Sequence, residues 1–167
     1  SLVQRMETAM ENTVATLWEG RVEGLPINTP EEAVILASIV EKETGIDAER
    51  AKVAGVFINR LNKGMRLQSD PTVIYALTEA REPLGRALTR ADWRIEHPYN
   101  TYVIDGLPPG PIANPGAAAI AAVLNPAEHD YIFFVADGSG GHAFSVTYDE
   151  HKRNIERARA ARRASGD

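Results

Sequence analysis

The chain has 167 residues, of which 44% are hydrophobic and 25% charged, which suits one domain with a substantial core. It contains no cysteine, which excludes disulfide bonds and thiolate metal sites, and its net charge of −5 argues against a nucleic-acid partner. It has no run of eighteen apolar residues and no signal peptide. We therefore expect the chain to be soluble, and we also expect a monomer.

Helical spacing of apolar residues and helix-capping signals predict a mostly helical chain. Capping boxes are expected at Thr29–Glu32 and Thr147–Glu150, and Asp47 and Asp70 are expected to cap the helices that they begin. Gly64 stands at a good helix-stop position. The expected helices span residues 1–18, 29–43, 47–63, 71–77 and 114–124, and a C-terminal helix is expected after residue 147. A single helical turn is also expected after residue 89.

A smaller set of segments favours extended structure. Residues 131–136 are apolar, aromatic and β-branched, and the glycine-rich turn at 137–141 leads back into residues 143–147, so a hairpin is expected. Residues 102–104 are expected to form a short strand, and the four prolines in residues 107–115 a rigid loop. The fold class is therefore α+β: a mostly helical domain with a small antiparallel β-hairpin lining the active-site cleft.

Glu43 is the residue that the helical pattern singles out. At about 100° per residue it lies on the same apolar face as Leu36 and Ile39, whereas Glu41 falls toward the edge of that face. Burial and the negative end of the helix dipole both favour a protonated carboxyl group, as a general acid requires. The plain alternative is a solvated helix end with ordinary glutamates.

Polar residues cluster where the helix after residue 70 begins. Gln68, Ser69, Asp70 and Thr72 lie together there, and we interpret them as candidates to bind a polar substrate, although Asp70 is also explained as a simple helix cap.

Two further segments combine aromatic, amide and imidazole groups. Asn100 and Tyr102 provide the mix of flat ring and amide that sugars need, in a segment that also reads as an ordinary loop entering a strand. The segment GSGGHAF places glycines beside His142 and Phe144, which suits close approach of a ligand to the backbone, or alternatively a flexible hairpin tip. The histidines lack metal-ligand spacing, so we expect no metal and no cofactor.

Four segments of the chain resemble one family closely. These segments, ILASIVEKET (35–44), VFINRLNKGMRLQSDPTVIYAL (56–77), YNTYVIDGLPPGPIANPG (99–116) and FVADGSGGHAFSVTYDEH (134–151), resemble the MltG/YceG-like endolytic murein transglycosylases. The resemblance covers most of residues 30–151 in order. It implies cleavage of the peptidoglycan bond between N-acetylmuramic acid and N-acetylglucosamine, leaving a 1,6-anhydromuramyl end, with Glu43 as the catalytic acid.

The resemblance also carries expectations about the longer protein. Members of the family are typically anchored in the cytoplasmic (inner) membrane by one N-terminal helix, face the periplasm and cell wall, and carry a LysM-like subdomain before the catalytic region. Residues 1–28 are therefore expected to be a helix and linker, and residues 29–167 an excised catalytic domain. The expected partners are peptidoglycan glycan strands and cell-wall synthesis enzymes. Two alternatives stay open: a two-carboxylate muramidase-type hydrolase using Asp70, and a non-catalytic glycan-binding module.

Overall fold

The computed structural model describes residues 1–166, which form six α-helices, one 3₁₀ turn and a two-stranded antiparallel sheet. This confirms the predicted α+β class. No helix in the described range is both long and apolar enough to cross a membrane. The elements are α1 (Leu2–Glu19), α2 (Pro30–Glu43), α3 (Asp47–Lys63), α4 (Asp70–Thr78), η1 (Asp92–Arg94), α5 (Ala117–Leu124), β1 (Phe133–Ala136), β2 (His142–Ser145) and α6 (Tyr148–Ala164).

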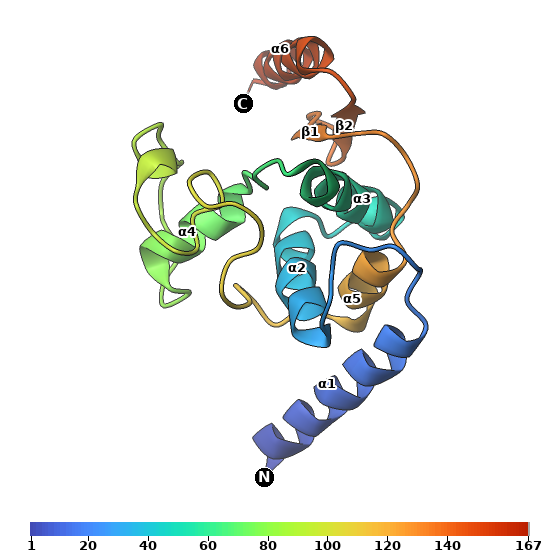
Figure 1. The fold of residues 1–167 in the computed structure, drawn as a ribbon. Coiled ribbons are helices and arrows are strands. Elements are labelled where there is room, and N and C mark those ends of the chain that lie inside the picture. Colours follow the sequence, from blue (N-terminus) through green and yellow to red (C-terminus); the bar gives the residue numbers. More distant parts are fainter. Residues whose placement is uncertain (167) are drawn as a thin grey trace.

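The core lies between α2, α3 and α5, which occupy the centre of the molecule in Figure 1. The apolar face predicted for α2 is sealed: Leu36 and Ile39 have no exposed surface, and Phe57 of α3 is 1% exposed. Burying an aliphatic or aromatic side chain of this size contributes about 1.5–3 kcal/mol relative to leaving it exposed. Helix α4 with its long loop lies on one side of this core, and the hairpin with α6 lies on another (Figure 1).

Helix α1 forms as predicted but buries little of its surface. Only Val14 is buried, while Leu2, Val3 and Met6 are 58–67% exposed. Figure 1 shows the N-terminal half of α1 extending away from the rest of the domain.

The chain leading into the hairpin is tied along one side of α3. The Asn59 amide donates to the backbone carbonyls of His129 and Tyr131, at 2.8 and 2.9 Å, and Arg60 Nε donates to that of Ile132 at 2.7 Å. Gly55 permits this approach, since a Cβ there would lie 2.6 Å from the Ala127 carbonyl oxygen. Helix α3 therefore fixes where the hairpin begins.

The hairpin is confirmed, with Phe133 paired to Ser145 and Ala136 to His142, but its strands are shorter than predicted and only partly buried. The carbonyl groups of residues 131 and 132 bond to side chains of α3 instead of a neighbouring strand. At the other end Thr147 already caps α6, accepting a hydrogen bond from the Glu150 backbone, so β2 stops before it.

Several local predictions were wrong, and in each case a nearby polar group explains the difference. Residues 102–104 form a turn, because Asn100 Oδ1 accepts a hydrogen bond from the Tyr102 N–H. Helix α5 begins at Ala117 instead of residue 114, because the N–H of its N-cap Gly116 donates to the Glu41 carboxylate at 2.8 Å.

Neither aspartate caps its helix as expected. Asp47 and Asp70 are each the first helical residue, and the N-cap positions before them carry no side-chain cap hydrogen bond. Asp47 pairs with Arg50 instead. By contrast, Thr29 caps α2 as predicted and Gly64 ends α3 in the left-handed conformation, with φ of 69°.

Candidate active site

Glu43 is the last residue of α2, and its partly buried side chain lies on the buried face of that helix, at the edge of the core. Its Oε1 accepts a 2.7 Å hydrogen bond from the hydroxyl of Ser69. Burial raises the pKa of Glu43 from 4.5 to about 7; the Ser69 hydrogen bond opposes this shift, the Asp70 charge adds to it, and His142 opposes it. Glu43 is therefore protonated in a large fraction of molecules at neutral pH, which is the property of a general acid.

Ser69 is held by the turn that follows Asn100. Its backbone N–H donates to Thr101 Oγ1 at 2.9 Å, and the Gln68 N–H donates to the Thr101 carbonyl at 3.2 Å. Gln68 has a φ of 51°, which a non-glycine residue rarely adopts, and its side chain is exposed. Strained backbone of this kind persists where surrounding contacts fix it, often at functional sites.

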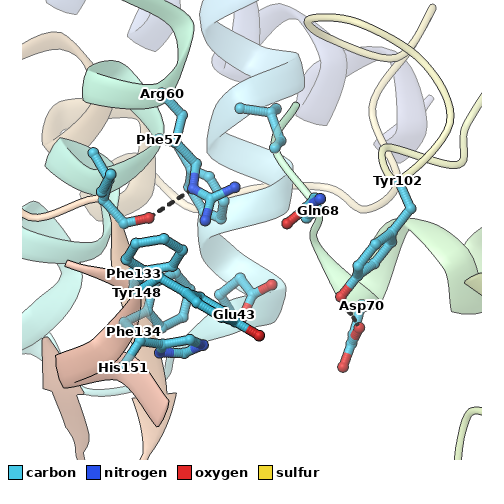
Figure 2. A pocket seen from close by; sticks show the side chains of 12 residues that line it. Glu43, Phe57, Arg60, Gln68, Asp70, Tyr102, Phe133, Phe134, Tyr148 and His151 are labelled. Atoms are coloured by element: carbon cyan, nitrogen blue, oxygen red, sulfur yellow. Dashed lines mark hydrogen bonds between the residues drawn. The ribbon is translucent and has the colours of Figure 1, made fainter. Parts of the chain in front are cut away.

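A cavity of about 230 Å³ opens over Glu43. Figure 2 shows its lining side chains converging from separate elements. One side, which we name the hairpin wall, consists of Phe133, Phe134, Tyr148 and His151. The opposite side, the loop wall, consists of Gln68, Asp70 and Tyr102, while Phe57, Arg60, Leu67 and Ile132 complete the lining.

The loop wall is organised by Asp70. Its Oδ1 accepts hydrogen bonds from the Tyr102 hydroxyl at 2.6 Å and from Trp93 Nε1 at 3.0 Å. The two rings stack on one another, with centroids 5.2 Å apart and an 18° angle between their planes. The helix-cap explanation of Asp70 was therefore wrong: its carboxylate holds two aromatic side chains.

Thr72 and Asn100 lie behind this wall with no exposed surface. The Thr72 hydroxyl bonds to the Ser69 carbonyl at 2.6 Å and to Thr101 Oγ1 at 2.8 Å. The Asn100 amide donates to the Trp93 and Ile95 carbonyls. Their polar groups are occupied within the protein, so both residues are placed to support the loop and not to reach the cavity.

His142 and Phe144 also do not line the cavity; both pack against Phe134, which does, with ring centroids 5.4 and 6.0 Å from it. Glu49 holds His142 through both carboxylate oxygens. Its Oε1 accepts a hydrogen bond from the His142 backbone N–H at 3.0 Å, and its Oε2 pairs with His142 Nδ1 at 2.7 Å. Gly141 allows this contact, because a Cβ there would lie 2.9 Å from Glu49 Oε1.

The sequence analysis did not identify the apolar lining of the cavity, nor several polar and aromatic residues in and around it: Glu49, Arg60, Trp93, Tyr148 and His151. Arg60 of α3 is only 7% exposed, and it donates hydrogen bonds to the Ile132 and Arg66 carbonyls. The available signal was its position in the sequence, a basic residue between the apolar residues Phe57 and Leu61 at helical spacing. Within residues 1–166 no group of three potential metal ligands occurs.

The fold and site together define a class: a small, mostly helical α+β domain with a cavity in which Glu43 is a carboxyl group suited to proton transfer. Over residues 1–157 the chain matches the YceG-like family, and it belongs to that family. It is 44% identical over 122 residues to the endolytic murein transglycosylase of Bacillus subtilis (strain 168), a match that covers 73% of this chain and 33% of the relative.

Other relatives agree with this assignment. The endolytic murein transglycosylase of Streptococcus pneumoniae (serotype 2, strain D39) is 35% identical over 158 residues, which cover 93% of this chain and 28% of that protein. The crystal structure of a putative yceG-like protein, lmo1499 from Listeria monocytogenes, superposes with a TM-score of 0.66 at 43% identity, covering 74% of this chain and 38% of that one. The chain thus spans about a third of the length of these relatives.

Proposed function

We propose that this chain carries the catalytic domain of a lytic transglycosylase that cleaves peptidoglycan glycan strands between N-acetylmuramic acid and N-acetylglucosamine. The observation that carries the proposal is Glu43, a carboxyl group whose pKa is raised to about 7 at the base of a cavity. Membership of the YceG-like family supports it, as do relatives named endolytic murein transglycosylase.

In the proposed reaction Glu43 acts first as acid and then as base. Ser69 donates a hydrogen bond to Oε1, so the proton of the neutral carboxyl group resides on Oε2. That proton passes to the glycosidic oxygen as the bond between this oxygen and C1 of N-acetylmuramic acid breaks. The C6 hydroxyl of the same muramic acid then attacks C1, and its proton returns to Glu43. No water is consumed, and one product ends in a 1,6-anhydro ring. An internal hydroxyl competes with water at high effective concentration.

One observation favours a hydrolase as the second candidate: Asp70 lines the same cavity as Glu43 and raises its pKa. Most glycosidases use a pair of carboxyl groups as their catalytic residues. Against this, Asp70 Oδ1 already accepts two hydrogen bonds, from Tyr102 and Trp93, which suits a structural anchor better than a base that activates water. A non-catalytic binding module would have no use for a buried carboxyl group with a raised pKa.

We also propose, from the family resemblance, that the longer protein is anchored in the cytoplasmic membrane with this domain facing the cell wall. Membrane fractionation and protease accessibility of the full-length protein in spheroplasts would test that location.

The activity is tested by digesting purified glycan strands with the parent chain, with Glu43→Gln and with Glu41→Gln. We expect Glu43→Gln to lose about 10²–10⁴-fold in rate, the usual contribution of a general acid–base group, and Glu41→Gln to retain activity. The Glu41 carboxylate bonds to Gly116, outside the cavity. Equal losses in both variants would contradict the assignment.

The product distinguishes the two candidate reactions. After borohydride treatment, mass spectrometry should find new ends that are lighter by one water than a reducing sugar and that take up no hydrogen. Ends that are reduced by borohydride would identify a hydrolase. Because the chain spans about a third of its relatives, a longer form should be assayed beside it.

A further inference from the structure

Arg60 is a buried cation that forms no ion pair with any carboxylate of the described residues. It is 7% exposed and lines the cavity, yet no carboxylate within residues 1–166 forms an ion pair with it. Its Nε donates to the Ile132 carbonyl at 2.7 Å and its Nη1 to the Arg66 carbonyl at 2.8 Å. Burying a charge is costly unless it is paired, so an arginine kept here without a carboxylate calls for an explanation.

A purely structural role accounts for only part of this side chain. The two carbonyl contacts join α3 to the hairpin and to the loop after α3, and they occupy Nε and Nη1. Nη2 has no hydrogen-bond partner among the described residues and is not sealed from solvent. Figure 2 shows the guanidinium group directed from α3 into the cavity.

The surroundings of Arg60 fit an incoming polar group. Its guanidinium lies 5.3 Å from the Phe133 ring centroid, and the His151 ring stacks on the same phenylalanine at 4.9 Å. His151 Nδ1 is buried without a hydrogen-bond partner, while the ring lines the cavity. Burial and the charge of Arg60 lower the pKa of His151, so at neutral pH this imidazole is uncharged and does not compete with Arg60 for an anion.

We propose that Arg60 forms a carboxylate-binding subsite beside Glu43, which takes a carboxylate carried by the muramic acid residue of the glycan strand. This rests on the proposed function. Guanidinium groups match carboxylates in geometry, and charge-assisted hydrogen bonds are roughly twice as strong as neutral ones. N-acetylglucosamine has no carboxyl group, whereas muramic acid carries a lactyl group at O3. Arg60 thereby determines which of the two alternating sugars occupies the position next to Glu43.

The carboxylate has two chemical sources. In a strand without peptides it is the free lactyl carboxylate. In a strand that retains its stem peptides the lactyl carboxyl is an amide, and the carboxylates belong to the peptide. The affinities of matched ligands separate these sources without altering the protein.

The test measures binding by calorimetry to the Glu43→Gln chain, which keeps the ligand intact. Four ligands are compared: a peptide-free GlcNAc–MurNAc oligosaccharide, the same oligosaccharide with its lactyl groups converted to neutral amides, a peptide-bearing strand, and that strand with its peptide carboxylates amidated. We expect neutralisation to weaken binding about tenfold or more in one of the two pairs. A loss in the first pair identifies the lactyl group, and a loss in the second identifies the stem peptide.

Arg60→Gln should abolish this discrimination, whereas the exposed control Arg66→Gln should retain it. Should Arg60→Gln fail to fold, the ligand comparison on the Glu43→Gln chain still decides. Equal affinity for charged and amidated ligands would overturn the subsite while leaving the proposed function intact. Absence of binding to any of the four ligands, together with no cleavage by the parent chain, would instead count against the proposed function and remove the basis of the subsite.

Discussion

The raised pKa of Glu43 has a consequence for stability that can be measured without any substrate. Its pKa is about 7 in the folded chain, against an ordinary value of 4.5. Between these values the folded state holds a proton that the unfolded state has released, so stability falls as pH rises through this window. One pKa unit corresponds to about 1.4 kcal/mol, so the loss of stability that comes from ionising Glu43 is at most on the order of 3 kcal/mol.

Because the Glu43 side chain is only partly buried and faces the cavity, we expect its ionisation to lower the free energy of unfolding by about 1–3 kcal/mol. Glu43→Gln removes the ionisation while retaining an oxygen that can accept from Ser69. Its free energy of unfolding, relative to the parent chain, should therefore be higher at pH 8 than at pH 4 by this amount.

Urea denaturation followed by circular dichroism at both pH values measures the difference. Glu41→Gln is the matched control, and it should not reproduce the gain at pH 8, because its carboxylate accepts the Gly116 N–H at the start of α5. A Glu43→Gln effect that is the same at both pH values, or more favourable at pH 4, would refute the raised pKa of Glu43.

Two further predictions concern the groups around Glu43. Ser69→Ala removes the hydrogen bond that lowers the pKa of Glu43, so the pH at which activity falls on the alkaline side should rise by roughly one unit. An unchanged pH–rate profile for kcat/KM would contradict this role of Ser69. Glu49→Ala frees the backbone and ring of His142, and should lower the free energy of unfolding by about 1–3 kcal/mol and speed amide exchange in the hairpin; protection as slow as in the parent chain would disprove this anchoring role.

Glu43 could be located from the sequence because its position depends on one helix alone. The spacing from Leu36 and Ile39 fixes the face of α2, and the Thr29 cap fixes where that helix begins. Element type followed from local patterns in the same way, except at residues 102–104, where the nearby Asn100 side chain stabilises a turn instead of the expected strand. Glu41 reaches Gly116 across 75 residues and delays α5, which no local rule could anticipate.

The walls of the cavity could not be predicted because they depend on contacts distant in sequence. Asp70 accepts hydrogen bonds from Trp93, 23 residues away, and from Tyr102, 32 residues away. Sequence proximity to Ser69 favoured Thr72 as a binding residue, but the structure turns its hydroxyl inward to Thr101. The clusters of polar residues in the sequence indicated which loops border the cavity. They did not indicate which side chains of those loops face it.

Asp70→Asn separates the two candidate reactions at the residue where they differ. Asparagine retains an oxygen that can accept from Tyr102 and Trp93, so the loop wall should persist. The change removes a negative charge that raises the pKa of Glu43, and the alkaline limb of the pH–rate profile should therefore move to lower pH.

In a transglycosylase the variant should lose less than about tenfold in rate below that limb and should still form anhydro ends. If Asp70 instead activates water, the loss should approach about 10²–10⁴-fold at every pH. Parent products would then carry reducing ends, because a water molecule activated by Asp70 would replace the C6 hydroxyl as the nucleophile that attacks C1.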